Sequence, residues 1–334
     1  MFSVTNDMGF VPQSEKFEDR EMIGENINNY KVIRQGDFAY NPARINVGSI
    51  ARYQEDYPCM ISSLYVCFKP DEQLVNSDLL LHILKSPRLI DKYKLHGEGG
   101  VRIYLFYPNF AQIRIWLPKT NREQIKMAKL LNLIEERIVT QNRIIEELKL
   151  FRSAIYQKVF SSMHGETVAL CKIADIIKGK QINGTELYDT GDYYVMNGGT
   201  VPSGYYDDYN TPANTISISE GGNSCGYVQF NDVPFWSGGH CYTLSISSSQ
   251  IVLRYLFHYL KYREQDIMAL RIGSGLPNIQ KKNLERFQIL IPTFDGQHRY
   301  AKIFDSLQHK EVVETSLLNK WQTQKKYLLR QMFI

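Results

Sequence analysis

The feature of this 334-residue chain that most limits its fold is a long internal repeat. The segment NFAQIRIWLP at residues 109–118 returns as NLERFQILIP at residues 283–292, a shift of 283 − 109 = 174 residues. An apolar helical pattern follows each copy, with AKLLNLIEERI starting at Ala128 and AKIFDSLQHKE starting at Ala301. A repeat of this length predicts two similar modules that helices hold apart. Such an arrangement suits measuring and positioning better than it suits a single catalytic cleft.

Residues 121–161 contain neither proline nor glycine, so nothing in this stretch breaks a helix. Apolar residues recur there at spacings of three and four, the pattern of a coiled-coil seam. At about 1.5 Å per residue the helix would span roughly 60 Å. The matching positions near the end of the chain predict a second helix with apolar ends and a charged middle.

Two such helices can bury their apolar stripes against each other as an antiparallel pair, although each could instead pack only on its own domain. The residues predicted to pack between them are Leu131, Ile134, Ile138, Ile145, Leu148, Phe304, Leu307, Leu318, Trp321 and Leu328.

The remaining segments show short alternating apolar patterns typical of strands, interrupted by helical patterns at 77–95 and 251–270. We therefore predict an α+β fold, with two β-rich domains in pseudo-twofold repeat separated by two long antiparallel, coiled-coil-like helices. The predicted organisation is a first domain at 1–120, a spacer helix at 121–162, a second domain at 163–295 and a spacer helix at 296–334.

The front of the first domain looks incomplete. GFVPQ at residues 9–13 resembles GTVPS at residues 199–203, a shift of 199 − 9 = 190, so residue 1 corresponds to about residue 191. The first domain would then lack a counterpart to residues 165–190. We expect that another chain supplies the missing strands or that the domain is weakened by their loss.

Composition and motifs argue against an enzyme. The net charge of +4 and the pI of about 8.6 are compatible with nucleic acid but only weakly indicate it. No GxxxxGK[ST] loop for ATP is present. Asn-Pro-Ala-Arg at 41–44 superficially resembles an amino-methyltransferase motif, but it lacks the second proline and the stacking aromatic. The glycine-rich segments 97–100 and 221–226 are interpreted as turns rather than as cofactor loops.

The same inspection predicts no metal site and no membrane segment. The five cysteines form no CxxC pair, so a structural zinc is not expected. Neither a signal peptide nor an apolar run of about 18 residues is found, which predicts a cytoplasmic protein with reduced thiols. Four histidines on helical or linker segments are interpreted as surface or core residues: His82, His164, His258 and His309.

Several of these segments together resemble the specificity subunit of type I restriction–modification systems. The most specific are GDFAYNPARINVGSI at 36–50 and GSGLPNIQKKNLERFQILIP at 273–292, supported by IADIIKGKQI at 173–182. The resemblance covers nearly the whole chain. It departs from the pattern at the second helix start, where Gly296 replaces an acidic residue before the glutamine.

The resemblance implies two target-recognition domains that each read a short half-site in the DNA major groove, while the helices set the distance between half-sites. The subunit would have no catalytic activity. It would bind double-stranded DNA, two adenine methyltransferase subunits and, in the full complex, the restriction and translocase subunits. It would bind no cofactor itself, because S-adenosylmethionine, ATP and Mg²⁺ belong to those partners.

Four other interpretations remain open. The chain could serve another DNA-modification or phage-defence system, or it could be a truncated variant that reads one half-site through residues 165–295. A coiled-coil scaffold without DNA binding and a stand-alone methyltransferase fit the sequence less well, the latter because no complete cofactor or catalytic motif is present.

Direct readout needs donors and acceptors on loops, with lysine and arginine around them for the phosphates. In the first domain the candidates are Arg44, Asn46, Ser49 and Arg52; in the second they are Lys178, Lys180, Gln181, Asn183, Asn197, Ser203, Lys281 and Lys282. Lys281 and Lys282 suit phosphate contact. For each candidate, the alternative is an ordinary turn or solvated residue.

Overall fold

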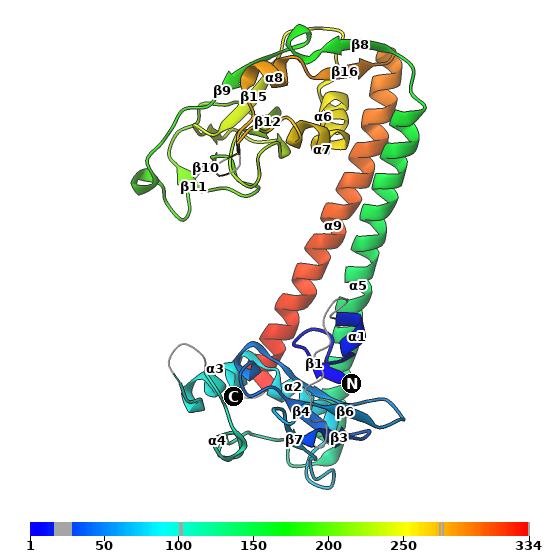
Figure 1. The fold of residues 1–334 in the computed structure, drawn as a ribbon, viewed down its shortest axis with the longest axis vertical. Helices are drawn as coiled ribbons and strands as arrows, with labels where there is room; N and C mark the ends of the chain where they lie inside the picture. Colours follow the sequence, from blue (N-terminus) through cyan, green and yellow to red (C-terminus); the bar gives the residue numbers. More distant parts are fainter. Residues whose placement is uncertain (17–28, 100–102, 274, 276, 333–334) are drawn as a thin grey trace. The chain divides into compact units, whose positions relative to one another are not determined.

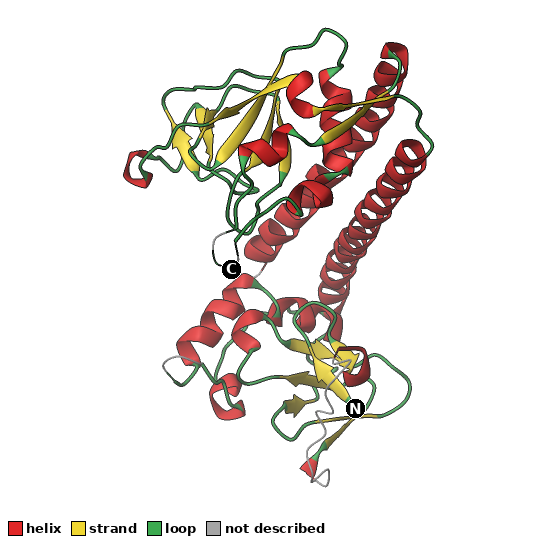
Figure 2. Cartoon of the chain, turned by 45° about the horizontal axis from the view of Figure 1, so that its top comes forward, coloured by secondary structure: helices red, strands yellow, loops and turns green. Residues whose placement is uncertain are grey.

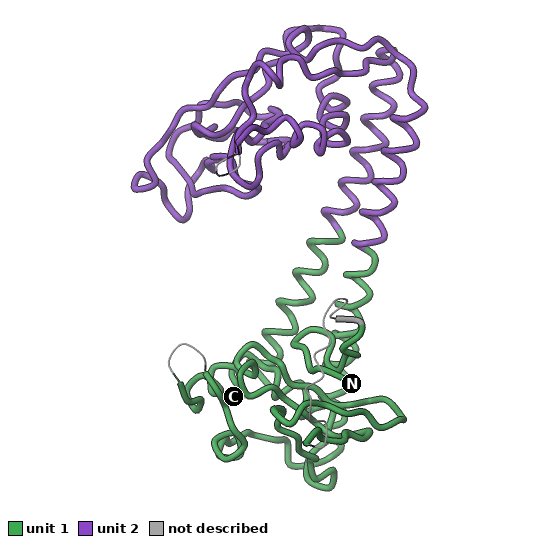
Figure 3. The backbone as a smooth tube through the Cα atoms, viewed as in Figure 1, with its two compact units in different colours: residues 1–144, 314–334 green, residues 145–313 purple. Residues whose placement is uncertain are grey.

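The computed structural model describes residues 1–16, 29–99, 103–273, 275 and 277–332. Gly100 of the first glycine-rich segment, and Ser274 and Leu276 of the GSGLPN turn, lie outside the described residues. The chain divides into two compact units (Figure 3): unit 1 comprises residues 1–144 and 314–334, and unit 2 comprises residues 145–313. Each unit mixes helices with strands (Figure 2), so the predicted α+β class is confirmed.

Both predicted long helices are present. α5 (Asn121–Ser161) and α9 (Phe294–Met332) each run through part of both units (Figure 1). The compact units therefore include portions of the helices that the sequence pattern assigns to separate segments. None of the helices described is long and apolar enough to cross a membrane.

Unit 2 is built on a four-stranded antiparallel sheet in the order β13-β12-β15-β9. These strands are β9 (Ala174–Lys178), β12 (Thr215–Ser219), β13 (Val228–Asn231) and β15 (Cys241–Ile246). A smaller sheet, β11-β10-β14, and a pair, β16-β8, complete the unit. Their strands are β8 (Glu166–Ala169), β10 (Tyr193–Met196), β11 (Gly204–Tyr206), β14 (Trp236–Ser237) and β16 (Gln288–Ile291).

The short helices of unit 2 are α6 (Leu253–Tyr262), α7 (Glu264–Met268) and α8 (Lys281–Glu285), with 3₁₀ turns η3 (Leu170–Lys172) and η4 (Gly184–Glu186). Side chains of one strand point alternately to the two faces of a sheet, so Ile216 and Ile218 of β12 face the same way. They join α6 and the aromatic residues Tyr156, Phe160 and Phe304 of the long helices in one apolar core.

In its described residues, unit 1 has seven short strands in two sheets, β2-β1-β6-β3 and β5-β4-β7. They are β1 (Phe2–Val4), β2 (Phe10–Pro12), β3 (Lys31–Ile33), β4 (Phe38–Tyr40), β5 (Ile50–Arg52), β6 (Cys59–Ile61) and β7 (Val66–Phe68). Its helices are α1 (Gln13–Lys16), α2 (Ser77–Leu84), α3 (Pro87–His96) and α4 (Tyr107–Ala111), with the 3₁₀ turn η2 (Ile45–Val47).

The central strand β4 of unit 1 is buried on both faces. Phe38 and Tyr40 pack with α2, α3 and Leu131 of α5, whereas Ala39 lies in a second cluster with residues of β1, β3 and β6. The small alanine between two large aromatics allows the two sheets of unit 1 to approach each other. Unit 1 is therefore a three-layer arrangement with its larger core on the helix side.

The strand pairings identify the repeat in three dimensions. β1 pairs antiparallel with β2 and parallel with β6, as β10 pairs antiparallel with β11 and parallel with β14. The sheet β5-β4-β7 corresponds to β13-β12-β15. Unit 2 has β8 and β9 in addition, and they lie in the segment 165–190 for which the sequence predicts no counterpart. No described strand of unit 1 occupies either place.

A buried glutamine marks the start of each long helix. Gln124 Oε1 accepts from the Asn76 N–H at 2.8 Å, and its Nε2 donates to the carbonyls of Leu74 and Pro118. Gln297 repeats the arrangement: it accepts from the Val252 N–H at 2.8 Å and donates to the carbonyls of Gln250 and Pro292. Each glutamine thus fastens the first turn of a long helix to the loop before α2 or α6.

The long helices contact each other within each unit. Residue numbers at the contacts rise along α5 as they fall along α9, as in an antiparallel pair. In unit 1, Gln141 Nε2 donates to Glu314 Oε2 at 2.6 Å, and Lys325 pairs with Glu135. In unit 2, Arg152 pairs with Glu311 at 2.8 Å. Of the residues predicted for the seam, Leu131, Ile134, Ile138, Ile145 and Phe304 are buried, while Leu148, Leu307, Leu318, Trp321 and Leu328 are half-buried.

Candidate nucleic-acid interface

Three segments of unit 2 meet around the carboxylate of Glu220. Lys178 Nζ, at the end of β9, donates to Glu220 Oε1 at 2.8 Å, and the hydroxyl of Tyr242 donates to the same atom at 3.0 Å. The Ile279 N–H donates to the Glu220 carbonyl at 2.8 Å, which joins the segment ahead of α8 to the same place. Burial and the Glu220 carboxylate together raise the pKa of Tyr242, so its hydroxyl stays protonated and remains a donor. The backbone around this surface is therefore firmly held.

Two exposed lysines lie beside this junction on the first turn of α8. Lys281 Nζ is 3.8 Å from Glu285 Oε1, a weak pair in water, and Lys282 is exposed. The buried side chain of Leu284 anchors α8 in the core of unit 2. The helix thus presents two exposed ammonium groups from a position that the core fixes, an arrangement that would suit phosphate contact.

The segment after β9 also presents exposed side chains from a clamped backbone. The Lys180 N–H donates to the Ser237 carbonyl at 2.8 Å, and the Lys180 carbonyl accepts from Trp236 Nε1 at 2.9 Å. Gln181 is exposed, and its Nε2 donates to the Ile182 carbonyl at 3.0 Å. The side chains of Lys180 and Gln181 are therefore available to solvent beside a rigid main chain.

The other polar candidates of unit 2 differ in their solvent exposure and in the hydrogen bonds that they make within the fold. Asn183 Nδ2 donates to Glu186 Oε1 at 3.2 Å across the turn η4. Asn197 is half-buried, and its Oδ1 accepts from the His240 N–H at 3.1 Å, so this acceptor already serves the fold. Ser203 is exposed. Asn197 therefore shapes the loop, whereas Ser203 presents its hydroxyl to solvent.

Exposed carboxylates limit where phosphates could approach unit 2. The loops around β10 and β11 carry Asp189, Asp192, Asp207 and Asp208, all exposed, and they would repel DNA phosphates. The exposed Arg271 directly precedes Ile272, which forms a β-bridge with Asn278 ahead of α8. Sequence reasoning missed Arg271, although its place two residues before GSGLPN could have indicated it.

The four candidates of unit 1 are in four different environments. Arg44 is exposed ahead of η2, and Asn46 is half-buried within η2. Arg52 pairs with Asp78 at 2.6 Å. Ser49 is only 3% exposed, and its hydroxyl donates to the Val4 carbonyl at 2.8 Å. The DNA contact of Ser49 stays a prediction, and in this structure the hydroxyl is used internally, where it joins the η2 loop to β1.

Unit 1 lacks counterparts to the α8 lysines. The bridge between Glu98 and Tyr104 matches the bridge between Ile272 and Asn278, since 272 − 98 = 174 and 278 − 104 = 174. With the same shift, Tyr107 and Pro108 stand where unit 2 has the two lysines. The exposed side chains there are aromatic, with Tyr104 and Phe106 stacked at 6.1 Å between ring centroids. The two units thus present different chemistry at equivalent places.

Residues 165–320 match the family described as Type I restriction modification DNA specificity domain. A putative type I specificity subunit of Mycoplasma pneumoniae is 32% identical over 154 residues, which are 44% of this chain and 41% of that protein. A putative type I specificity subunit of Mycoplasma genitalium is 34% identical over 116 residues, which are 34% of this chain and 30% of that protein. The matches thus span less than half the length of these relatives.

Solved structures show the same fold over most of the chain. The S subunit of a type I restriction–modification system from M. genitalium matches with a TM-score of 0.70 at 18% identity, covering 90% of this chain and 84% of that one. A chain from a study of complex assembly and conformational transition of the type I R-M system matches with a TM-score of 0.57 at 16% identity, covering 90% and 82%.

The β-rich unit around Glu220 is thus of the class of DNA specificity domains. The chain that carries this unit is similar to type I restriction–modification specificity subunits in sequence over residues 165–320, and it shares their fold over most of its length.

Proposed function

We propose that this chain is the sequence-reading subunit of a type I restriction–modification complex. The observation that carries the proposal is the family match over residues 165–320, which enclose the clamped, lysine-bearing surface of unit 2. Rigid main chain, solvated lysines and exposed amide and hydroxyl groups are the components that phosphate positioning and base readout need.

The repeat of the fold supports a bipartite target. Each unit would read one half-site, with the long helices setting the gap between the half-sites. The chain would bind double-stranded DNA without acting on it. Methylation of adenine and cleavage would belong to two methyltransferase subunits and to the restriction–translocase subunits that dock on it. S-adenosylmethionine, ATP and Mg²⁺ would be bound by those partners.

Replacing Lys281 and Lys282 by alanine tests the phosphate contact. We expect the double variant to bind all DNA sequences more weakly, because each lysine lost from a phosphate removes about one unit from the slope of log K against log salt. The measurement is fluorescence anisotropy of a labelled duplex, with and without the target, over a series of salt concentrations.

The matched control is the double variant Lys302→Ala, Lys310→Ala, which removes the same charge from exposed positions on α9. An equal loss in the control would show that only net charge matters. A changed target sequence in the α8 variant, read as a new methylation motif, would contradict the assignment to phosphate contact.

A further inference from the structure

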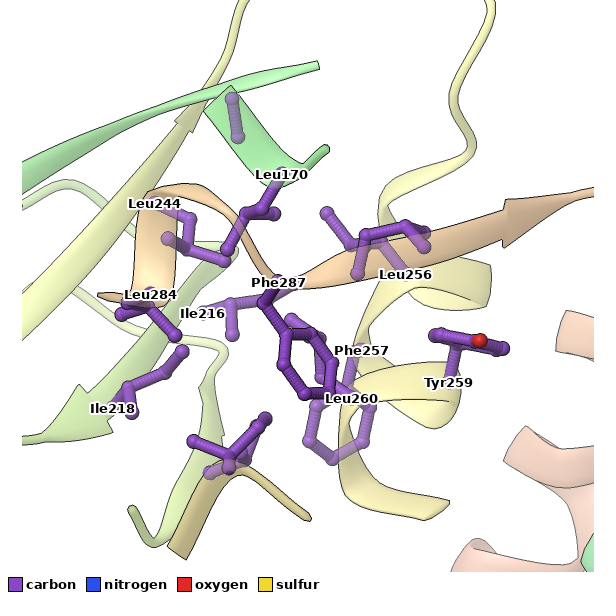
Figure 4. Packing of buried hydrophobic residues seen from close by; sticks show 14 of the residues in the cluster. Leu170, Ile216, Ile218, Leu244, Leu256, Phe257, Tyr259, Leu260, Leu284 and Phe287 are labelled. Atoms are coloured by element: carbon purple, nitrogen blue, oxygen red, sulfur yellow. The ribbon is translucent and has the colours of Figure 1, made fainter. Parts of the chain in front are cut away.

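In unit 2, β12 ends beside the start of β15, and this brings Glu220 and His240 together. The two strands pair antiparallel with Ser219 opposite Cys241, and the Glu220 N–H donates to the His240 carbonyl at 2.9 Å. The next core residue along β12, Ile218, lies in the apolar core of the unit (Figure 4). The core therefore anchors the strand ends that carry the two side chains.

The loop that ends at His240 is packed closely against two other segments. A Cβ atom at Gly238 would lie 2.9 Å from the Cβ of Asn197, and one at Gly239 would lie 3.2 Å from the Cβ of Gln181. Both approaches are closer than ordinary side-chain contact, so glycine suits both places. The His240 N–H also donates to Asn197 Oδ1 at 3.1 Å. The main chain that carries the imidazole is therefore fixed from several sides.

His240 is the one long side chain of this loop, whose sequence at 237–240 is Ser-Gly-Gly-His. The imidazole is 63% exposed. Lys178, Gln181 and Asn197, which the sequence analysis proposes for DNA contact, come from other segments and lie around the loop and Glu220. The fold thus places an exposed histidine, which the sequence analysis did not select, in the middle of the proposed contacts.

The two carboxylate oxygens of Glu220 have different surroundings. Oε1 accepts from Lys178 Nζ at 2.8 Å and from the Tyr242 hydroxyl at 3.0 Å. Oε2 is buried and has no hydrogen-bond partner among the described residues. His240 Nδ1 lies 3.8 Å from Oε2, which is longer than a hydrogen bond. A small rotation of the imidazole that lets Nδ1–H donate to Oε2 would satisfy this buried acceptor.

We propose that His240 reads a purine of the DNA target and that Glu220 is its positioning residue. An Nδ1–H that donates to Glu220 Oε2 leaves Nε2–H to donate to purine N7, the acceptor that adenine and guanine both present in the major groove. Pyrimidines lack this atom, so the contact would distinguish a purine from a pyrimidine. The inference rests on the proposed function, because it requires DNA in front of unit 2.

The surroundings of His240 favour a base edge over a phosphate. The Glu220 carboxylate beside the imidazolium offsets its charge and weakens its attraction for a phosphate. Lys281 and Lys282, on the neighbouring α8, instead present exposed ammonium groups. Phosphate contact is a matter of charge and position, whereas base readout needs a directed hydrogen bond. A fixed imidazole with one nitrogen held by a carboxylate supplies such a bond.

Unit 1 carries different chemistry at the equivalent place. The pairing of β4 with β7 matches that of β12 with β15, so Phe68 corresponds to Leu244, a shift of 244 − 68 = 176. With that shift Leu64 (240 − 176), which is 78% exposed, stands where unit 2 has His240. A change at His240 should therefore affect one half-site of a bipartite target and leave the other unchanged.

The test is His240→Ala in the full chain, assembled with its methyltransferase partners. Sequencing of methylated DNA should show the parent motif with a single purine position of one half-site relaxed. Anisotropy should show binding of the target duplex weakened on the order of 10-fold and binding of an unrelated duplex changed by less than about twofold. His164→Ala, at an exposed position between α5 and β8, is the matched control and should change neither.

A modified duplex tests the atom without any protein variant. A target with a 7-deazapurine at the relaxed position lacks N7 and keeps the Watson–Crick edge. The parent chain should bind it on the order of 10-fold more weakly than the natural target. The His240→Ala chain should bind the two duplexes equally, because the variant has no donor left to lose.

Glu220→Gln tests the positioning role. We expect it to relax the same purine position, because an amide no longer holds the hydrogen on Nδ1. In the His240→Ala background the same substitution should add no further relaxation there. An effect that acts through Lys178 would instead change the affinity for all sequences alike. Circular dichroism and the thermal midpoint of each variant show whether it is folded.

Two outcomes would overturn the inference alone. One is a His240→Ala complex with the motif of the parent. The other is a variant that binds every duplex more weakly by the same factor, since His240 would then contact a phosphate. A parent complex that shows no sequence preference at all would contradict the proposed function itself, and the reading role of His240 with it.

Discussion

Gln124 and Gln297 show how much one polar residue can determine at the residue scale. Each is almost fully buried, at 4% and 1% exposure, in a place that an apolar side chain would otherwise occupy. A glutamine amide supplies one acceptor and two donors, and here all three meet main-chain groups. The bonds of Gln297 satisfy the Val252 N–H and two carbonyls at a point where α9 begins and water is excluded.

We expect Gln297→Ala to lower the free energy of unfolding by roughly 2–4 kcal/mol, because it leaves buried main-chain groups without partners. Urea unfolding followed by circular dichroism measures the loss. Gln265→Ala, at an exposed position on α7, is the matched control and should change stability by less than about 0.5 kcal/mol. Equal losses in the two variants would show that the buried hydrogen bonds add nothing to the free energy of unfolding.

At the scale of elements, His258 of α6 connects the two long helices inside unit 2. Its Nδ1 accepts from the hydroxyl of Tyr156 on α5 at 2.8 Å, and its Nε2 donates to Asp305 Oδ1 on α9 at 2.7 Å. Burial lowers the pKa of His258 to about 4, although the hydrogen bond to Asp305 acts in the opposite direction. Burial raises the pKa of Asp305, but the hydrogen bonds from Arg254 and His258 outweigh it and lower that pKa overall.

This arrangement predicts a loss of stability in mild acid. The ordinary histidine pKa is 6.5, so between pH 6.5 and about 4 the unfolded chain binds a proton that the folded chain excludes. The contribution of His258 is therefore complete above pH 6.5 and falls, by up to about 3 kcal/mol, as the pH drops to 4. Urea midpoints measured across this range should fall less steeply for His258→Gln than for the parent chain.

His309→Gln, at an exposed position on α9, serves as the comparison for that variant. The expectation fails if the pH dependence of the His258→Gln protein matches that of the parent. Unit 1 carries an equivalent contact, His82 Nε2 to Asn132 Oδ1 at 2.6 Å, in which an amide replaces the carboxylate. The pKa of His82 is also lowered by burial, so a residual acid effect is expected from unit 1.

At the scale of the whole molecule, the proposed function assigns the gap of a bipartite target to α5 and α9. Inserting seven residues between Ile144 and Ile145 and seven between Val313 and Glu314 would lengthen both helices by about 10 Å. We expect the half-site sequences to stay the same and the gap between them to grow by about three base pairs, at roughly 3.4 Å each. Sequencing of methylated DNA from cells that hold the variant with its partner subunits measures the gap.

The control is a variant of constant length. In it, other helix-forming surface residues replace the seven residues on each side of the two insertion points. Its target should be unchanged. An unaltered gap after the double insertion would rule out the helices as the ruler, and altered half-sites would mean that they also take part in reading.

Local pattern was sufficient to predict the elements. An uninterrupted helical run, a seam at spacings of three and four, and alternating strands depend on neighbours in the chain, so α5, α9 and the α+β class followed from the sequence. The equivalence of Gln124 and Gln297 was visible as a repeated helix start. The same information does not say which side chains are buried by distant segments.

Tertiary structure alone decided the rest. Ser49 was a reasonable DNA-contact residue by its type and its loop, but packing against β1 buries its hydroxyl. The bridge between Ile272 and Asn278 drew attention to the neighbouring Arg271, which the sequence analysis had passed over. The repeat by itself predicted two modules and an incomplete first one. Among the described residues, the fold leaves β7 at the edge of its sheet with an apolar cavity beside Phe68. Such a cavity is made by side chains far apart in the sequence, so no local pattern records it.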